Sequence, residues 1–224
     1  MKKNAFGLLV LLLSVLISVS PGNAQSSVQA PVLQKGIATC SDLSGGCSGG
    51  GGGGLVLVEQ HTASNSATLD FTSCITSTYD DYLIKGVQLV PATNAVNLLL
   101  TFSSDGGSTW IATNYAWVYS FAGATSADSG VVTNASDTSI HISNANSNGT
   151  SKSVSFKAEL FNPLAAIFTS MLYDVQQNNS GGGNLYRYTG TSQYGVATAL
   201  NAFRIAFSSG NITSGTVRCY GLAK

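Results

Sequence analysis

The sequence has few charged residues and, after its first two dozen residues, no long apolar run. Only 9% of the 224 residues are Asp, Glu, Lys or Arg, and the formal net charge is zero. No block of like charges occurs, which argues against nucleic-acid binding, because neutralising phosphates requires clustered Lys and Arg. Ser, Thr, Asn and Gly must therefore cover most of the surface, a composition typical of exported β proteins.

The short motifs that mark most catalytic and metal sites are also missing. There is no GxSxG elbow and no CxxC or His pair at zinc-ligand spacing. The glycine run 49–54 has no Lys and no helix start after it, so it does not predict a phosphate loop. Asp80 and Asp81 are adjacent and point to opposite faces of a strand, so they cannot flank one glycosidic bond. Asp105 lacks the further acids of a calcium loop. We therefore expect no catalytic residue, no metal and no cofactor.

Residues 1–24 have the pattern of a secretory signal peptide. Lys2 and Lys3 precede an apolar stretch over residues 5–19, and small residues lead to a predicted cleavage site after Ala24. The apolar stretch is about 15 residues long, whereas a helix needs about 20 to span a bilayer. We expect a secreted or periplasmic protein with no membrane span after signal removal.

The cysteines fit an oxidising compartment, in which disulfides persist. The simplest pairing joins neighbours at each end of the chain, Cys40 with Cys47 and Cys74 with Cys219. However, Cys74 is one residue out of phase with Leu69 and Phe71, which are expected to face inward. A continuous strand would point Cys74 outward, away from Cys219. The sequence therefore leaves the Cys74–Cys219 pairing open.

After the signal peptide, the sequence predicts two parts. Residues 25–54 are polar and irregular and end in six consecutive glycines, which predicts a flexible arm and linker. Residues 55–224 alternate apolar and polar residues in short runs between turn residues, which predicts one β domain. The expected strands are 55–61, 67–72, 82–90, 96–102, 115–121, 154–160, 167–173, 184–189, 203–207 and 215–222.

About ten short strands without a convincing amphipathic helix predict an all-β fold, an antiparallel, jelly-roll-like β-sandwich. A closed barrel is the main alternative. The sequence Asp105-Gly106-Gly107 predicts a hairpin turn between Phe102 and Trp110.

Four segments together resemble a recurrent domain of bacteriophage tail-fibre and other virion structural proteins. They are LVLVEQHTASNSATLDF (55–71), STYDDY (77–82), SSDGGSTW (103–110) and ALNAFRIAFSSGNITSGTVRCYGL (199–222). The resemblance implies a β-sandwich on a fibre or virion surface, homo-oligomeric (for example trimeric), that binds a receptor or glycan. It offers no catalytic motif. The signal peptide and the cysteines depart from this pattern.

Aromatic side chains that reach the surface are the candidate ligand contacts, since sugars and peptides stack on them. Trp110 follows a turn, and three tyrosines lie in a segment bounded by glycines: Tyr186, Tyr188 and Tyr194. Alternatively, Tyr186 and Tyr188 share one strand face and pack inward.

The sequence thus predicts a non-enzymatic, exported structural or adhesion protein that binds a surface receptor or glycan. The alternative is a secreted monomeric carbohydrate-binding module, which differs in its assembly.

Overall fold

The computed structural model describes residues 54–124, 128–180 and 184–222. The predicted signal peptide, residues 25–53 of the predicted arm, and Cys40 and Cys47 lie outside the described residues. All described residues belong to one compact unit. None of the segments described forms an apolar helix long enough to cross a membrane.

The described part of the chain forms twelve strands, and apolar and polar residues alternate along most of them. They are β1 (Leu55–Thr62), β2 (Leu69–Phe71), β3 (Asp81–Pro91), β4 (Val96–Ser103), β5 (Tyr115–Gly123), β6 (Ser129–Asp137), β7 (Ile140–Asn146), β8 (Val154–Phe161), β9 (Thr169–Asn178), β10 (Leu185–Tyr194), β11 (Ala202–Phe207) and β12 (Ile212–Leu222). Each of the ten strands expected from the alternation corresponds to one of these.

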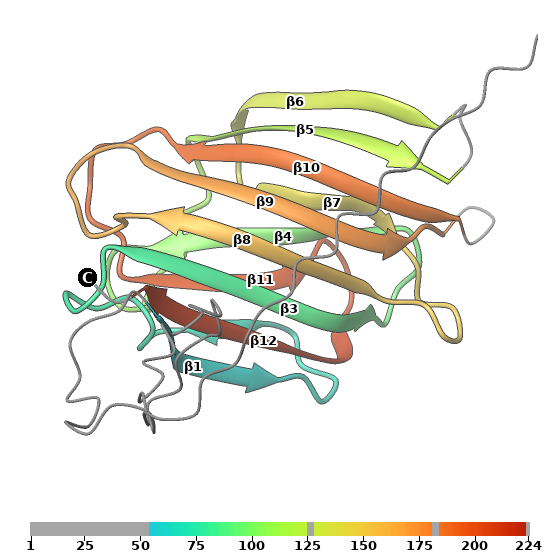
Figure 1. Cartoon of the computed structure of the whole chain (residues 1–224), viewed down its shortest axis with the longest axis horizontal. Helices are drawn as coiled ribbons and strands as arrows, with labels where there is room; N and C mark the ends of the chain where they lie inside the picture. Colours follow the sequence, from blue (N-terminus) through green and yellow to red (C-terminus); the bar gives the residue numbers. More distant parts are fainter. Residues whose placement is uncertain (1–53, 125–127, 181–183, 223–224) are drawn as a thin grey trace, which may run out of the picture. The chain divides into compact units, whose positions relative to one another are not determined.

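The strands form two antiparallel sheets. The large sheet has eight strands in the order β1-β12-β3-β8-β9-β10-β5-β6, and the small sheet has four in the order β2-β11-β4-β7. The small sheet lies against one face of the large sheet (Figure 1). The prediction of an all-β, antiparallel sandwich is therefore confirmed.

The core lies between the inner faces of the two sheets. On β8, the four apolar residues at alternate positions are at most 4% exposed: Val154, Phe156, Ala158 and Leu160. On the small sheet, Leu98, Leu100 and Phe102 of β4 are equally buried. Such burial of apolar surface is the main source of stability for a sandwich of this kind.

Glycines on the inner face of the large sheet make room for aromatic rings. Four glycines lie directly opposite an aromatic residue of the neighbouring strand: Gly86 and Phe156, Gly123 and Tyr186, Gly130 and Phe121, Gly190 and Tyr173. A Cβ on Gly190 would lie only 2.5 Å from the Tyr173 ring. The rings cover backbone that would otherwise be exposed, a device that stabilises glycine within a sheet.

The predicted turn at Asp105 forms, and the Ile111 backbone N–H donates to the Phe102 carbonyl across it at 2.9 Å, but no strand follows it to complete a hairpin with β4. β4 belongs to the small sheet and β5 to the large sheet, so the turn joins two layers rather than two paired strands. The two strands face each other across the core instead: the backbone N–H of Phe102 donates to the Tyr115 hydroxyl at 2.8 Å.

Cys74 and Cys219 form a disulfide. β2 ends at Phe71, and the chain turns before it reaches Cys74, so the strand phase that pointed Cys74 outward does not extend to it. Both cysteines are fully buried. The bridge joins residues 145 positions apart and ties the first part of the domain to its last strand.

Candidate functional site

The outer face of the small sheet carries a cleft whose floor comes from two paired strands. Arg204 on β11 lies opposite Thr101 on β4, and Ala206 lies opposite Leu99. These four side chains point away from the core and are half-buried. The floor therefore combines an apolar part with a cation and a hydroxyl.

Loops raise the walls of this cleft, which has a volume of about 320 Å³. One wall follows β4, and a second comes from the connection between β6 and β7. The residue that precedes β2 lies at the opposite edge of the small sheet. Lining residues of the walls are Trp110, Ile111, Ala112, Thr138, Ser139 and Thr68. The volume falls at the low end of the range for small-molecule sites.

Asp105 holds the loop that presents Trp110. Its carboxylate accepts hydrogen bonds from the Ser103 hydroxyl at 2.6 Å, the Thr109 backbone N–H at 2.9 Å and the Thr109 hydroxyl at 2.7 Å. The bond from Ser103 and those from Thr109 lower the pKa of Asp105 to about 2. Gly107 has a φ of +86° and packs under the Trp110 ring, a left-handed conformation that favours glycine. Asp105 is thus a structural residue of the turn.

Trp110 is held by a cation. The Arg204 guanidinium carbon lies 4.3 Å from the centre of the Trp110 ring, within cation–π range. Nε and an Nη of Arg204 donate to the two carboxylate oxygens of Asp70, both at 2.7 Å. Partial burial opposes ionisation of Asp70, but the hydrogen bonds from Arg204 and Thr68 outweigh it and lower the pKa of Asp70. The ion pair fixes the guanidinium, and the guanidinium supports the indole.

The cleft offers polar and apolar contacts to a ligand. Of the described residues that line it, Arg204 is the single ionisable one, and its charge is already paired with Asp70. Among the described residues, no group accepts a hydrogen bond from the Trp110 indole N–H. An indole edge, neighbouring hydroxyls and an aliphatic floor suit a small polar ring with an apolar face.

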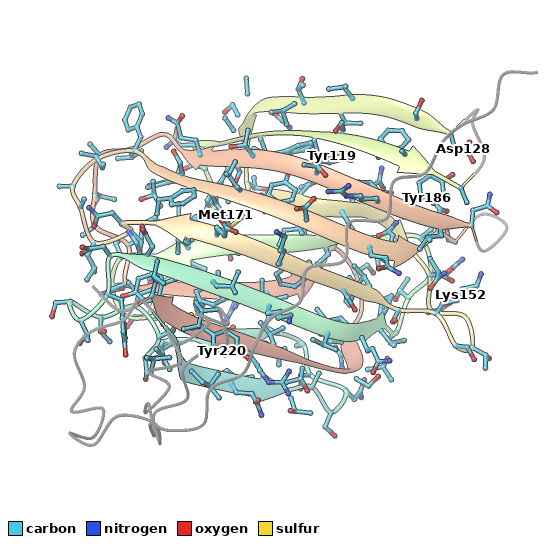
Figure 2. All side chains as sticks on the ribbon, in the orientation of Figure 1. Tyr119, Asp128, Lys152, Met171, Tyr186 and Tyr220 are labelled. Atoms are coloured by element: carbon cyan, nitrogen blue, oxygen red, sulfur yellow. A yellow bond between two sulfur atoms is a disulfide. The ribbon has the colours of Figure 1, made fainter. Side chains whose placement is uncertain are left out.

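Trp110 is where the sequence placed it, at the surface after a turn, but the three predicted tyrosines are not. Tyr186, Tyr188 and Tyr194 are 8%, 3% and 6% exposed and face the core between the sheets. The Tyr188 hydroxyl donates to the Asn144 carbonyl at 3.1 Å. Figure 2 shows Tyr186 at the end of β10 beside Asp128. Their expected exposure is therefore wrong, since period two puts all three on the inner face, and the structure does not bring them to Trp110.

A second polar cluster lies at the β7 edge. His141 stacks on Trp117 with ring centres 4.7 Å apart, and its Nε2 lies 3.6 Å from the Asp137 carboxylate. The Trp117 indole N–H donates to the same carboxylate at 3.1 Å. Burial lowers the pKa of His141, although Asp137 opposes this shift. No group of three or more His, Cys, Asp or Glu in the described part of the chain is arranged to hold a metal ion.

Arg204 and Asp70 were not expected at the site from the sequence. Alternation along 203–207 puts Arg204 on the wet face of its strand, but nothing local pairs it with residue 70, 134 positions away. Only the β2-β11-β4 register brings these residues under Trp110.

No protein-family model, curated protein or solved structure matches the chain.

Proposed function

We propose that this chain is an exported, non-enzymatic structural or adhesion protein that binds a glycan or a glycan-bearing surface receptor in the Trp110 cleft. The observation that carries this proposal is the cleft itself, in which a half-exposed tryptophan is fixed above hydroxyl and aliphatic groups by a paired arginine. Sugars present apolar C–H faces and hydroxyl edges, and this combination of groups complements both.

The Cys74–Cys219 disulfide supports export. Disulfides of this kind persist in oxidising compartments and are rare in reducing ones. Together with the sequence of residues 1–24, it favours a secreted, periplasmic or particle-surface location.

We also propose that the domain self-associates through the edge strand β1. β1 is an edge strand of the large sheet, and Leu55, Val56 and Leu57 are between 44% and 52% exposed. Leu222, opposite Leu55 on β12, is 39% exposed. Contiguous exposed apolar residues mark contact surfaces, as a fibre-like or surface assembly requires. Size exclusion with light scattering distinguishes such an oligomer from the alternative, a monomeric carbohydrate-binding module.

Glycan binding in the cleft is tested in two steps. The exported chain is screened on a glycan array, and the affinity for each hit is then measured by tryptophan fluorescence. We expect Trp110→Ala to weaken binding by at least about tenfold, the effect of losing a central aromatic contact. Phe168→Ala is the control, because Phe168 is a 53% exposed aromatic residue outside the cleft. Hits that bind Trp110→Ala as well as the parent protein would exclude this cleft, and turnover of a bound glycan would exclude the non-enzymatic assignment.

A further inference from the structure

The outer face of the large sheet carries three cations in direct cross-strand register. Arg218 on β12 lies opposite Lys85 on β3, and Lys85 lies opposite Lys157 on β8. Residues opposite one another in adjacent strands have Cβ atoms about 5 Å apart. The three cations therefore form one row across three neighbouring strands, although they are far apart in the sequence.

Such a row is unfavourable for the sheet itself. Like charges directly opposite one another destabilise strand pairing. Lys157 has a partner, since its Nζ lies 3.5 Å from the Asp174 carboxylate. For Lys85 and Arg218, no described carboxylate lies within 4 Å, and Arg218 Nε donates instead to the uncharged Gln60 at 2.6 Å. A row of cations that the protein does not neutralise is expected where an anion binds.

The distribution of charge over the domain strengthens this expectation. Residues 55–224 include seven Lys or Arg and nine Asp or Glu, a net charge of −2. Yet the row and Arg187 of β10, also on the outer face, hold four of the seven cations. Asp174 is the acid among them, and it pairs with both Lys157 and Arg187. Glu159 and Asp81 face the same side, two and four residues away from the row along β8 and β3.

The cations border a shallow groove of about 790 Å³. Lys85, Lys157 and Arg187 line it, together with the polar side chains of Ser155 and Gln176. Asp174 also lines the groove, between Lys157 and Arg187, with which it pairs. A second depression, which contains Arg218, shares Val87 with the first. The two form one track across β12, β3, β8, β9 and β10, about 20 Å long at the usual strand spacing.

We propose that this track binds an anionic polysaccharide. Carboxylate or sulfate groups along the chain would contact Arg218, Lys85, Lys157 and Arg187, and sugar hydroxyls would contact Ser155 and Gln176. A duplex nucleic acid is disfavoured, because its binding draws on about six to ten phosphate contacts, more than four cations provide. A membrane surface is disfavoured, because a flat surface does not enter a groove. The inference does not depend on the Trp110 cleft.

The test measures binding of the full exported chain to immobilised heparin, which carries sulfates, and to polygalacturonate, which carries carboxylates. Neutral dextran, duplex DNA and vesicles with anionic lipid are the comparison surfaces. We expect binding to at least one of the two polyanionic sugars and weaker binding to all three comparison surfaces. Affinity should fall as salt rises from about 50 to 200 mM, because counterions are released on binding.

The double variant Lys85→Gln/Lys157→Gln should bind the polysaccharide about tenfold more weakly and lose part of the salt dependence. Lys85→Arg/Lys157→Arg should retain binding. This charge-retaining double variant is the matched control for the two positions. Lys152, in the β7–β8 connection (Figure 2), lines the second depression and is left unchanged.

Circular dichroism and thermal unfolding of each variant establish that it is folded. Unchanged binding by the folded Lys85→Gln/Lys157→Gln variant would overturn the proposal. Equal binding to dextran would overturn it as well, and so would tighter binding to DNA or to the vesicles.

Discussion

At the scale of single residues, Gly190 gives the sharpest prediction of stability. It lies opposite Tyr173, whose ring occupies the space that a side chain would need. Gly190→Ala should lower the free energy of unfolding by about 1–3 kcal/mol, the usual cost of overpacking a filled core. Chemical denaturation monitored by circular dichroism measures this change.

Gly195 provides the control for that substitution. Gly195 is exposed, and a Cβ added to it would meet only the Asn114 carbonyl oxygen, at 3.4 Å. Gly195→Ala should therefore change stability by less than about 0.5 kcal/mol. Equal effects of the two substitutions would show that the Tyr173 ring is not the cause.

The same scale shows why the candidate site could be predicted only in part. Trp110 was identified because a turn precedes it, and a turn is a local signal. For Tyr186 and Tyr188, the glycines beside them favour the surface, whereas their shared strand face favours inward packing. In the structure those side chains follow the strand period instead and fill the core. Local chemistry indicates that an aromatic residue is significant, but only the register decides which face it covers.

At the scale of strands, the cation row predicts that removing a charge stabilises the protein. Lys85 has a cation opposite it on both neighbouring strands. Lys85→Gln should raise the free energy of unfolding by about 0.2–1 kcal/mol, or the midpoint of thermal unfolding by about 1–3 °C.

This effect is measured by differential scanning calorimetry at low and high salt, because salt screens the repulsion. The gain should shrink as salt rises, and Lys152→Gln should show no comparable gain. A loss of stability in Lys85→Gln would mean that the row does not repel as its register implies.

The burial of each strand also explains which strands could be predicted from the sequence. Nine of the ten expected strands bury one face, and this leaves an alternation of apolar and polar residues; β1 has no buried residue and shows only as an apolar run, LVLV, before a polar one. β6 and β7 were not anticipated. β6 is an edge strand with Val131 67% exposed and Val132 next to it, so its apolar residues do not alternate. β7 has two apolar residues, Ile140 and Ile142, before a polar run. β6 pairs only with β5, the strand directly before it, whereas β7 pairs with the distant β4.

At the scale of the whole molecule, the Cys74–Cys219 bridge should dominate stability. It closes a loop across 145 positions. By the chain-entropy estimate such a loop contributes about 5 kcal/mol, and removal of native disulfides typically costs about 2–5. Cys74→Ala/Cys219→Ala should therefore lower the free energy of unfolding by about 3–5 kcal/mol, measured by urea denaturation.

Cys40→Ala/Cys47→Ala is the comparison, since it changes the same number of cysteines outside the described residues. It should have the smaller effect, because any bridge between these two cysteines would close a short loop. Equal losses in the two double variants would contradict the dominant role of the long bridge.

The bridge also determines how the domain responds to mechanical tension. Leu55 and Leu222 lie opposite each other at the same end of β1 and β12. When these two ends are pulled apart, the force follows the backbone to Cys74, crosses the sulfur atoms to Cys219 and leaves through the last residues of β12. Residues 75–218, which hold most of the Trp110 cleft and all of the cation row, lie outside this covalent path. The sandwich can therefore be pulled by its ends while most of its ligand-binding surfaces carry no load.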